Sequence, residues 1–260
     1  MKDGQQELLS FGGHLEVLRR MLFRIIAVAG LIAVLVFCFK EQTFAMLLAP
    51  SRWDFVTYRL IEQLLQGVGI DFHFEPYHVD LIATELSSQF MTHVSTAVYL
   101  GLLASSPYIM YELFRFVSPA LYENERRYSV RVSVTIYVLF IVGVLMTYFI
   151  LFPISFRFLG TYSVDESVRS TITLDSYITT FLSLTLVMGA VFQLPVLSFF
   201  LGKMGVINAE LLARYRRHAL VLLMLVAAII TPPDIMTLIL VSIPLYLLYE
   251  ASILTLKIKH

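Results

Sequence analysis

Two carboxylates and two guanidinium groups stand together in the segment Glu123-Asn-Glu125-Arg126-Arg127, between long apolar runs. A carboxylate accepts a guanidinium group through two parallel, charge-assisted hydrogen bonds, a fit that lysine does not reproduce. Glu123 and Glu125 could therefore bind arginines that belong to another chain. The alternative is that they neutralise their own arginines, or that Glu125 begins a helix whose N-terminus favours negative charge.

Three more polar side chains interrupt segments that are otherwise apolar: Glu112, Gln193 and Glu250. Polar and ionisable groups inside a membrane are costly, so each marks a candidate functional position. Glu112 and Glu250 could instead reach the membrane surface by snorkelling, and Gln193 could be buried against a polar neighbour. Because an amide does not titrate, any mechanism that requires protonation of residue 193 is excluded.

The composition is that of a membrane protein. Of the 260 residues, 58% are hydrophobic and 15% are charged, and the mean hydropathy is +0.79. A soluble domain is nearer half apolar and a quarter charged, whereas about 20 apolar residues suffice to cross a bilayer as a helix. The sequence predicts an all-α polytopic membrane protein, a single domain over 1–260, with six transmembrane helices near 21–40, 94–117, 130–155, 176–202, 218–232 and 235–256.

The basic residues indicate an orientation for these spans. With the N-terminus inside, fourteen of the nineteen Lys and Arg residues fall on the inner side and five on the outer side. This bias predicts that both termini, and the loop that contains Glu125, are cytoplasmic. In residues 1–20, apolar positions recur every three or four residues, which predicts a cytoplasmic interfacial helix that leads into the first span.

Residues 41–93 form a long outer loop between the first two spans. Apolar residues at helical spacing over 55–65 predict a short helix on the outer surface, and alternation over 70–75 predicts a strand. Pro107 is expected to bend the second span and Pro195 the fourth, because the ring nitrogen of proline cannot donate a backbone hydrogen bond. Pro119 and Pro233 are likewise expected to have structural roles. The turn Thr231-Pro232-Pro233-Asp234 predicts a tight hairpin between two short final spans, with Asp234 as a helix cap.

No catalytic arrangement can be assembled from these residues, so we do not predict an enzyme. Cys38 is the only cysteine, which excludes an intrachain disulfide and a thiolate metal cage. We therefore expect no metal and no cofactor, and the lipid bilayer rather than nucleic acid as a partner. The alternative function is a proton-coupled secondary transporter of a small solute. That class needs broken helices in matching halves around a midplane site, and the prolines of this chain do not repeat in that way.

Several short patterns occur in a fixed order along nearly the whole chain. They are SFGGHLEVLRR at 10–20, SPYIMYE at 106–112, FVSPALYENERR at 116–127, FPISF at 152–156, FQLPV at 192–196, TPPD at 231–234 and IPLY at 243–246. Each pattern alone is weak. Their order, together with the six expected spans, resembles the TatC family, the signal-peptide receptors of the twin-arginine protein translocase.

The resemblance implies a fold, a function and a set of partners. The fold is a concave, glove-like arrangement of six helices, the last two short, in the cytoplasmic (inner) membrane. Proteins similar to this one recognise the paired arginines of signal peptides on folded precursor proteins. They assemble with single-span TatA- and TatB-like subunits into an oligomeric receptor complex, and the proton-motive force drives the transport.

The resemblance also assigns roles to residues of the inner loop. The family pattern Pro-x-Leu-x-x-x-Glu-Arg begins here at Pro119 and places the receptor carboxylate at Glu125, followed by Arg126 and Arg127. Glu123 stands beside it as a second acidic group. The resemblance thus favours binding of a foreign arginine pair over neutralisation within the loop.

Two positions depart from the family pattern. The N-terminal glutamate of the family falls at Val17, and Glu16 stands one residue earlier, about 100° away around a helix. Either this helix is rolled, or the loop carboxylates work without a second acidic site; Arg19 matches the arginine of the family. In the fourth span, Gln193 stands where the family often has a glutamate, two residues before Pro195.

Overall fold

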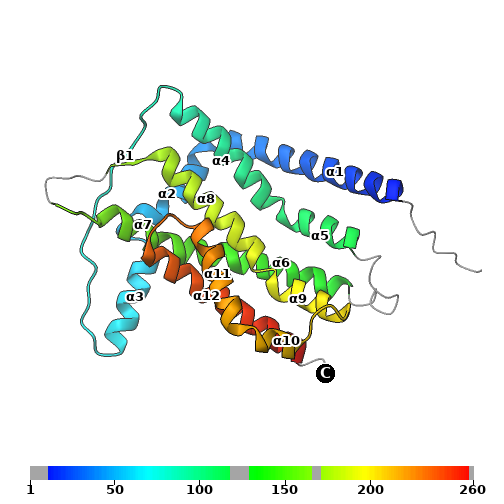
Figure 1. Cartoon of the computed structure of the whole chain (residues 1–260). Coiled ribbons are helices and arrows are strands. Elements are labelled where there is room, and N and C mark those ends of the chain that lie inside the picture. Colours follow the sequence, from blue (N-terminus) through cyan, green and yellow to red (C-terminus); the bar gives the residue numbers. More distant parts are fainter. Residues whose placement is uncertain (1–10, 118–128, 166–170, 258–260) are drawn as a thin grey trace, which may run out of the picture.

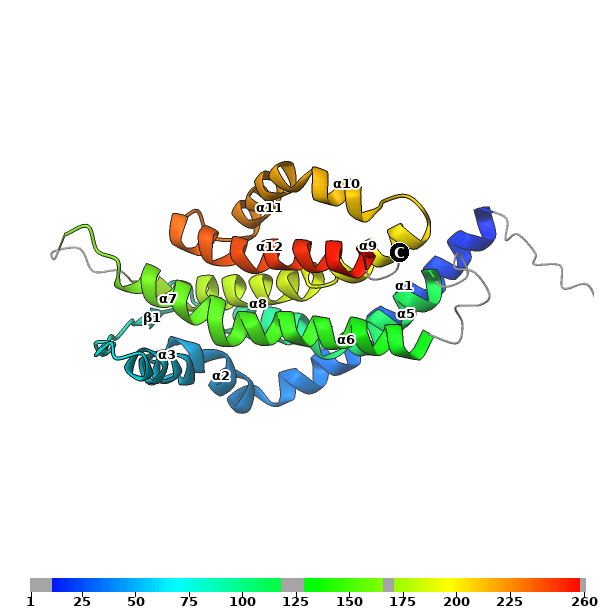
Figure 2. The same cartoon turned by 90° about the horizontal axis from the view of Figure 1, so that it is seen from below.

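The computed structural model describes residues 11–117, 129–165 and 171–257. Most helices run back and forth along one general direction (Figures 1 and 2). Along the molecule α1 packs on α4, α4 on α8 and α8 on α6, while α12 packs on α9 and α11. The bounds of these helices are Phe11–Cys38 (α1), Ser88–Ala104 (α4), Ser129–Met146 (α6), Leu174–Val191 (α8), Leu194–Lys203 (α9), Arg216–Ile230 (α11) and Ile235–Lys257 (α12).

The two ends of this helical layer differ, and we name them for use below. At the basal end α1 begins, α5 (Ser106–Val117) ends, α6 begins, and α10 (Ala209–Arg214) lies. The opposite end carries the cap, residues 40–87, with the first turns of α8 and α7 (Phe152–Thr161) against it. The cap contains α2 (Lys40–Leu48), the 3₁₀ turn η1 (Ala49–Ser51), α3 (Val56–Gly67) and the short strand β1 (Leu81–Ile82).

Within the described ranges, four helical stretches are long and apolar enough to cross a membrane: 15–38, 134–161, 174–203 and 235–257. They correspond to the first, third, fourth and sixth expected spans. The second is divided into α4 and α5, and the fifth is α11, whose 15 residues extend about 22 Å. The lengths and composition of these helices thus indicate a multi-pass membrane protein, and the number of six transmembrane helices stays a prediction.

One boundary prediction needs correction. The sixth span is not short, because α12 has 23 residues and continues past Glu250 to Lys257. Of the last two helices, only α11 is short. Residues 11–20 form the first turns of α1, which runs without a break from Phe11 to Cys38, and their interfacial position stays a prediction. The first ten residues of the expected interfacial helix lie outside the described ranges.

Proline marks the breaks in the second and fourth spans, as predicted. α4 ends at Ala104 and α5 begins at Ser106, so the second span breaks just before Pro107. In the fourth span, α8 ends at Val191 and Pro195 lies in the first turn of α9. A proline is tolerated in a first turn, where its missing N–H would be unpaired anyway, so each residue permits a new helix direction.

The third span contains a wider turn, the π-helical segment η4 (Thr147–Leu151), which joins α6 to α7. Pro153 follows it and cannot donate to the Phe149 carbonyl one turn earlier. The Thr57 hydroxyl of α3 donates to that carbonyl instead, and the Tyr58 hydroxyl donates to the Pro153 carbonyl at 2.7 Å. The start of α3 is therefore fastened to carbonyl groups of this irregular turn.

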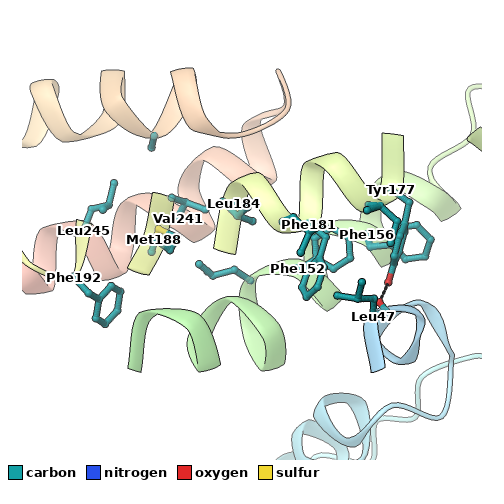
Figure 3. Close-up of a cluster of buried hydrophobic side chains, with 14 of the residues drawn as sticks. Leu47, Phe152, Phe156, Tyr177, Phe181, Leu184, Met188, Phe192, Val241 and Leu245 are labelled. Carbon is teal, nitrogen blue, oxygen red and sulfur yellow. Dashed lines mark hydrogen bonds between the residues drawn. The ribbon is translucent and has the colours of Figure 1, made fainter. Parts of the chain in front are cut away.

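Tyrosine hydroxyls also complete the end of α2. The last carbonyls of a helix lack donors within the helix, and here Tyr148 donates to the Met46 carbonyl at 2.9 Å, and Tyr177 to the Leu47 carbonyl at 2.8 Å. Figure 3 shows the second bond at the edge of the buried apolar cluster. This cluster joins α2, α7, α8 and α12 through Leu47, Phe152, Phe156, Tyr177, Phe181, Leu184, Met188, Val241 and Leu245.

The predicted strand at 70–75 is wrong. This stretch has no regular structure, and the Phe74 amide donates to the Glu62 carboxylate at 2.7 Å rather than to a neighbouring strand. The strand of this loop is β1, which pairs in parallel with β2 (Ile172–Thr173). The predicted helix at 55–65 is confirmed as α3.

Candidate functional site

The acidic loop predicted to bind arginine lies outside the described residues. Pro119, Glu123, Glu125, Arg126 and Arg127 all fall between Val117, where α5 ends, and Ser129, where α6 begins. Both of these helix ends lie at the basal end, the same end at which α1 starts (Figures 1 and 2). The chain therefore leaves and re-enters the described structure at the same end of the molecule as the N-terminal turns of α1, which carry Glu16 and Arg19.

In α1, Glu16 already has a counterion. The Arg20 guanidinium lies 2.5 Å from the Glu16 carboxylate, one turn along the helix, and both side chains are exposed. The Arg19 guanidinium lies over the Phe23 ring, 5.6 Å from its centre, and the Val17 side chain is exposed. The surface of α1 at the basal end thus presents a neutralised glutamate and one arginine that is held by an aromatic ring.

Glu112 of α5 is buried, with 5% of its surface exposed. It accepts a hydrogen bond from the Tyr108 hydroxyl at 2.9 Å, and the Arg24 guanidinium of α1 lies 3.5 Å away. Arg24 itself is half-exposed, so one member of the ion pair faces solvent and the other does not. This pair joins the first helix to the broken second one, and the snorkelling alternative for Glu112 is not what the structure shows.

Glu250 of α12 is paired more closely. Two guanidinium nitrogens of Arg216, at the start of α11, lie 2.8 Å from its two carboxylate oxygens, and the Tyr246 hydroxyl donates to it at 3.0 Å. The bidentate geometry neutralises the carboxylate within the protein. Glu250 therefore fastens α11 to α12 and explains why α12 continues beyond it.

Gln193 lies at the break between α8 and α9, and its amide nitrogen faces α6. The nitrogen donates to the Ile136 carbonyl at 3.1 Å and, more weakly, to the Gly189 carbonyl at 3.4 Å. The side-chain oxygen is buried, and no described residue donates to it. The amide thus holds the break against α6 and leaves one acceptor unused.

The turn between α11 and α12 confirms the predicted cap. The Asp234 carboxylate accepts a hydrogen bond from the Thr237 amide at 2.6 Å, and Pro232 and Pro233 form the bend. The second carboxylate oxygen of Asp234 and the Thr237 hydroxyl are buried with no hydrogen-bond partner among the described residues. The cap is structural, as expected from its position one residue before a helix.

At the cap end, sequence reasoning missed an arginine held by aromatic rings. The Arg157 guanidinium of α7 lies over Phe74, Tyr77 and Tyr58, at 4.5, 4.9 and 5.3 Å from the ring centres, and donates to the Glu75 carbonyl at 2.9 Å. Burial, together with the hydrogen bond to the Tyr77 hydroxyl, raises the pKa of Tyr58. Phe74 and Tyr77 lie in a loop with no regular structure, and no local pattern links that loop to Arg157.

Comparisons with known proteins now bear on these residues. Residues 13–244 match the family model described as Sec-independent protein translocase protein (TatC). The chain is 34% identical to the TatC of Blattabacterium sp. subsp. Periplaneta americana over 97% of this chain and 96% of that protein. It is 32% identical to the TatC of Escherichia coli (strain K12) over 92% of this chain and 84% of that protein.

A solved structure supports the same relationship. The crystal structure of a twin-arginine translocase receptor, TatC, superposes with a TM-score of 0.74 at 30% sequence identity. The match covers 94% of this chain and 98% of the crystallised one. The arrangement of helices in Figures 1 and 2 is therefore shared with a solved protein over nearly its full length.

Proposed function

The chain belongs to the TatC family of Sec-independent protein translocase components, which are not enzymes, and we propose that it is the receptor for paired arginines in signal peptides. In this proposal, the carboxylates of Glu125 and Glu123 accept the two guanidinium groups of a signal peptide on a folded precursor protein. The bidentate geometry explains a requirement for arginine rather than lysine.

One observation carries the proposal. The acidic loop connects the end of α5 to the start of α6, and both of these helix ends lie at the end of the molecule where α1 begins. The described carboxylates Glu16, Glu112 and Glu250 each have an arginine of this chain beside them. We infer that Glu125, supported by Glu123 and flanked by Arg126 and Arg127, supplies the charge for a foreign arginine.

The orientation and the assembly belong to the same proposal. The basal end faces the cytoplasm, both termini are cytoplasmic, and six helices cross the inner membrane in a concave arrangement. Single-span TatA- and TatB-like subunits join the chain in an oligomeric receptor complex, and the proton-motive force drives export.

The transporter alternative has no support from the described residues. A proton-coupled carrier needs a titratable group that is free to change its protonation state within the membrane. Gln193 cannot titrate, and Glu250 is held by two nitrogens of Arg216. Membership of a translocase family replaces this alternative.

A photocrosslinking experiment tests the proposal. A photoreactive amino acid is placed at position 125 in native membranes, and a precursor with a twin-arginine signal peptide is added. We expect a crosslink to the signal peptide that is lost when its two arginines are replaced by lysines. The same label at position 85, in the cap, is the control and should not react. Equal crosslinking of both peptides at position 125 would disprove the site.

A further inference from the structure

The exposed surface of α3 is divided into an apolar and a polar edge. Val56, Leu60 and Leu64 recur every four residues, and each is at least half exposed. Arg59, Gln63 and Gln66 form a separate exposed polar edge. The opposite side of the helix, with Thr57 and Tyr58, is buried against the protein. The apolar edge is therefore not used for packing within the chain.

We propose that α3 lies in the membrane interface at the cap end and inserts Val56, Leu60 and Leu64 into the acyl chains of that leaflet. A helix with apolar side chains on one edge and polar side chains on another is suited to lie parallel to a bilayer. The occupant of this edge is lipid, and the proposal does not depend on what the basal end binds.

The depth of α3 along the third span supports this position. About 20 residues, at 1.5 Å each, cross a hydrocarbon core of about 30 Å. Counted from Arg131, the basic residue that precedes the span, this length ends near Leu151. The hydroxyls of Thr57 and Tyr58 donate to the carbonyls of Phe149 and Pro153, on either side of that residue. The start of α3 is thus fixed at the boundary of the hydrocarbon core.

The direction of α3 and its neighbours agree with that depth. In Figure 1 α3 runs across the direction of the long helices, as a helix in the plane of a membrane surface must. Phe149 and Ile150, in the turn on which α3 is fastened, are themselves exposed side chains of a membrane-crossing stretch. The apolar edge of α3 therefore continues the lipid-facing surface of the third span.

The residues just before α3 have the chemistry of a headgroup region. Trp53 is more than half exposed, and tryptophan is enriched where a membrane meets water. Arg52 and Arg59 both lie near the Asp54 carboxylate, at 3.1 and 3.7 Å, which leaves one net positive charge beside the indole. Phospholipid phosphates complement that charge.

Trp53 provides the test, because it is the only tryptophan in the sequence. The full chain is reconstituted into phosphatidylcholine–phosphatidylglycerol vesicles in which lipids carry bromine either near the headgroup or near the chain ends. We expect bromine near the headgroup to quench Trp53 fluorescence more strongly than bromine near the chain ends. Full quenching by aqueous acrylamide with none by either brominated lipid would overturn the proposal.

Paired variants show whether the apolar edge holds the indole at that depth. The double variant Leu60→Asp, Leu64→Asp should lose most of the quenching by brominated lipid. The matched variant Gln63→Asp, Gln66→Asp carries the same added charge on the polar edge and should keep it. Loss of quenching in both variants, or in neither, would contradict the proposed role of the apolar edge. If a variant does not fold, the quenching measured on the unmodified chain still tests the proposal.

A second copy of the chain could cover the same edge, and crosslinking separates this outcome. In a Cys38→Ser background, Leu64→Cys should remain monomeric under oxidation in vesicles. Efficient disulfide-linked dimers at position 64, together with no quenching by brominated lipid, would assign the edge to a protein contact and overturn the assignment to lipid.

Discussion

The cap and the basal end of this protein are held together by different kinds of interaction. In and against the cap, hydroxyls of Thr57, Tyr58, Tyr148 and Tyr177 donate to the backbone carbonyls of Phe149, Pro153, Met46 and Leu47. At the basal end, ion pairs such as Glu16–Arg20 lie at the surface. Bonds to backbone carbonyls fix position, whereas surface charges can exchange partners. The comparison indicates a rigid cap and a chemically accessible basal end.

The difference follows from what each end has to do in the proposed function. A receptor surface must present charge to water and accept a partner from outside, so its own ion pairs have to be weak or exposed. The cap receives no charged partner in this account, and it can therefore bury Tyr58 and surround Arg157 with rings. The following predictions test this division, from the largest expected effect to the smallest.

Tyr58→Ala should have the largest effect on stability. It removes a buried ring, the bond to the Pro153 carbonyl and one ring around Arg157, and truncation of a buried aromatic residue costs about 3–5 kcal/mol. The thermal melting temperature of the detergent-solubilised protein measures the loss. Tyr58→Phe keeps the ring and should cost less. If Tyr58→Ala melts like the unmodified protein, the cap is not rigid in the way described.

Arg24→Gln should destabilise the protein more than Glu112→Gln does. The first change removes the Arg24 guanidinium from a buried carboxylate that also accepts from the Tyr108 hydroxyl, at a cost of about 1–3 kcal/mol. The second keeps an acceptor for Tyr108 and leaves Arg24 facing water. Melting temperatures of the two variants, compared side by side, measure the difference. Equal losses would mean that burial of Glu112 is unimportant for this ion pair.

Arg157→Lys should loosen the cap by a smaller amount. An ammonium group keeps the charge but loses the planar stacking on Phe74, Tyr77 and Tyr58, a loss of about 0.5–2 kcal/mol. Limited proteolysis of residues 68–80 should become faster while the helices remain resistant. Unchanged proteolysis would show that the hydrogen bond to Glu75, rather than the rings, holds this segment.

Glu16→Ala should have the smallest effect. Because Glu16 is exposed and already paired with Arg20, its removal is expected to change the affinity for a twin-arginine peptide by less than about fivefold, the upper range for an exposed ion pair. Fluorescence titration with a labelled peptide measures this. A larger loss would show that Glu16 separates from Arg20 and binds the peptide as a second carboxylate. The distinction between Glu125, which binds the peptide, and carboxylates that are paired within the chain would then not hold for Glu16.

Local patterns in the sequence predicted the features that depend on neighbouring residues. The amphipathic spacing over 55–65 is α3, Pro107 and Pro195 follow breaks, and Asp234 caps α12. These depend on helix periodicity and on the missing proline donor, both of which act within a few residues. The sixth span was expected to be short because Glu250 interrupts its apolar run.

Contacts between distant segments could not be predicted in the same way. Arg24 and Arg216 neutralise Glu112 and Glu250 from other helices, and no local pattern links these positions. One signal was available: Tyr108 and Tyr246 each stand four residues before the glutamate, on the same helix face. The strand predicted at 70–75 is wrong because Phe74, one of its alternating apolar residues, packs on Arg157. Its amide donates to Glu62 rather than to a neighbouring strand.

The most direct test of the central claim is a double-mutant cycle between Glu125 and the arginine pair of a signal peptide. Affinities of a twin-arginine peptide and its twin-lysine counterpart are measured for the unmodified protein and for Glu125→Ala in lipid nanodiscs. A charge-assisted bidentate contact of about 1.5–3 kcal/mol predicts a preference for arginine of about 10- to 150-fold, which disappears in Glu125→Ala. An arginine preference that persists undiminished in Glu125→Ala would contradict the account.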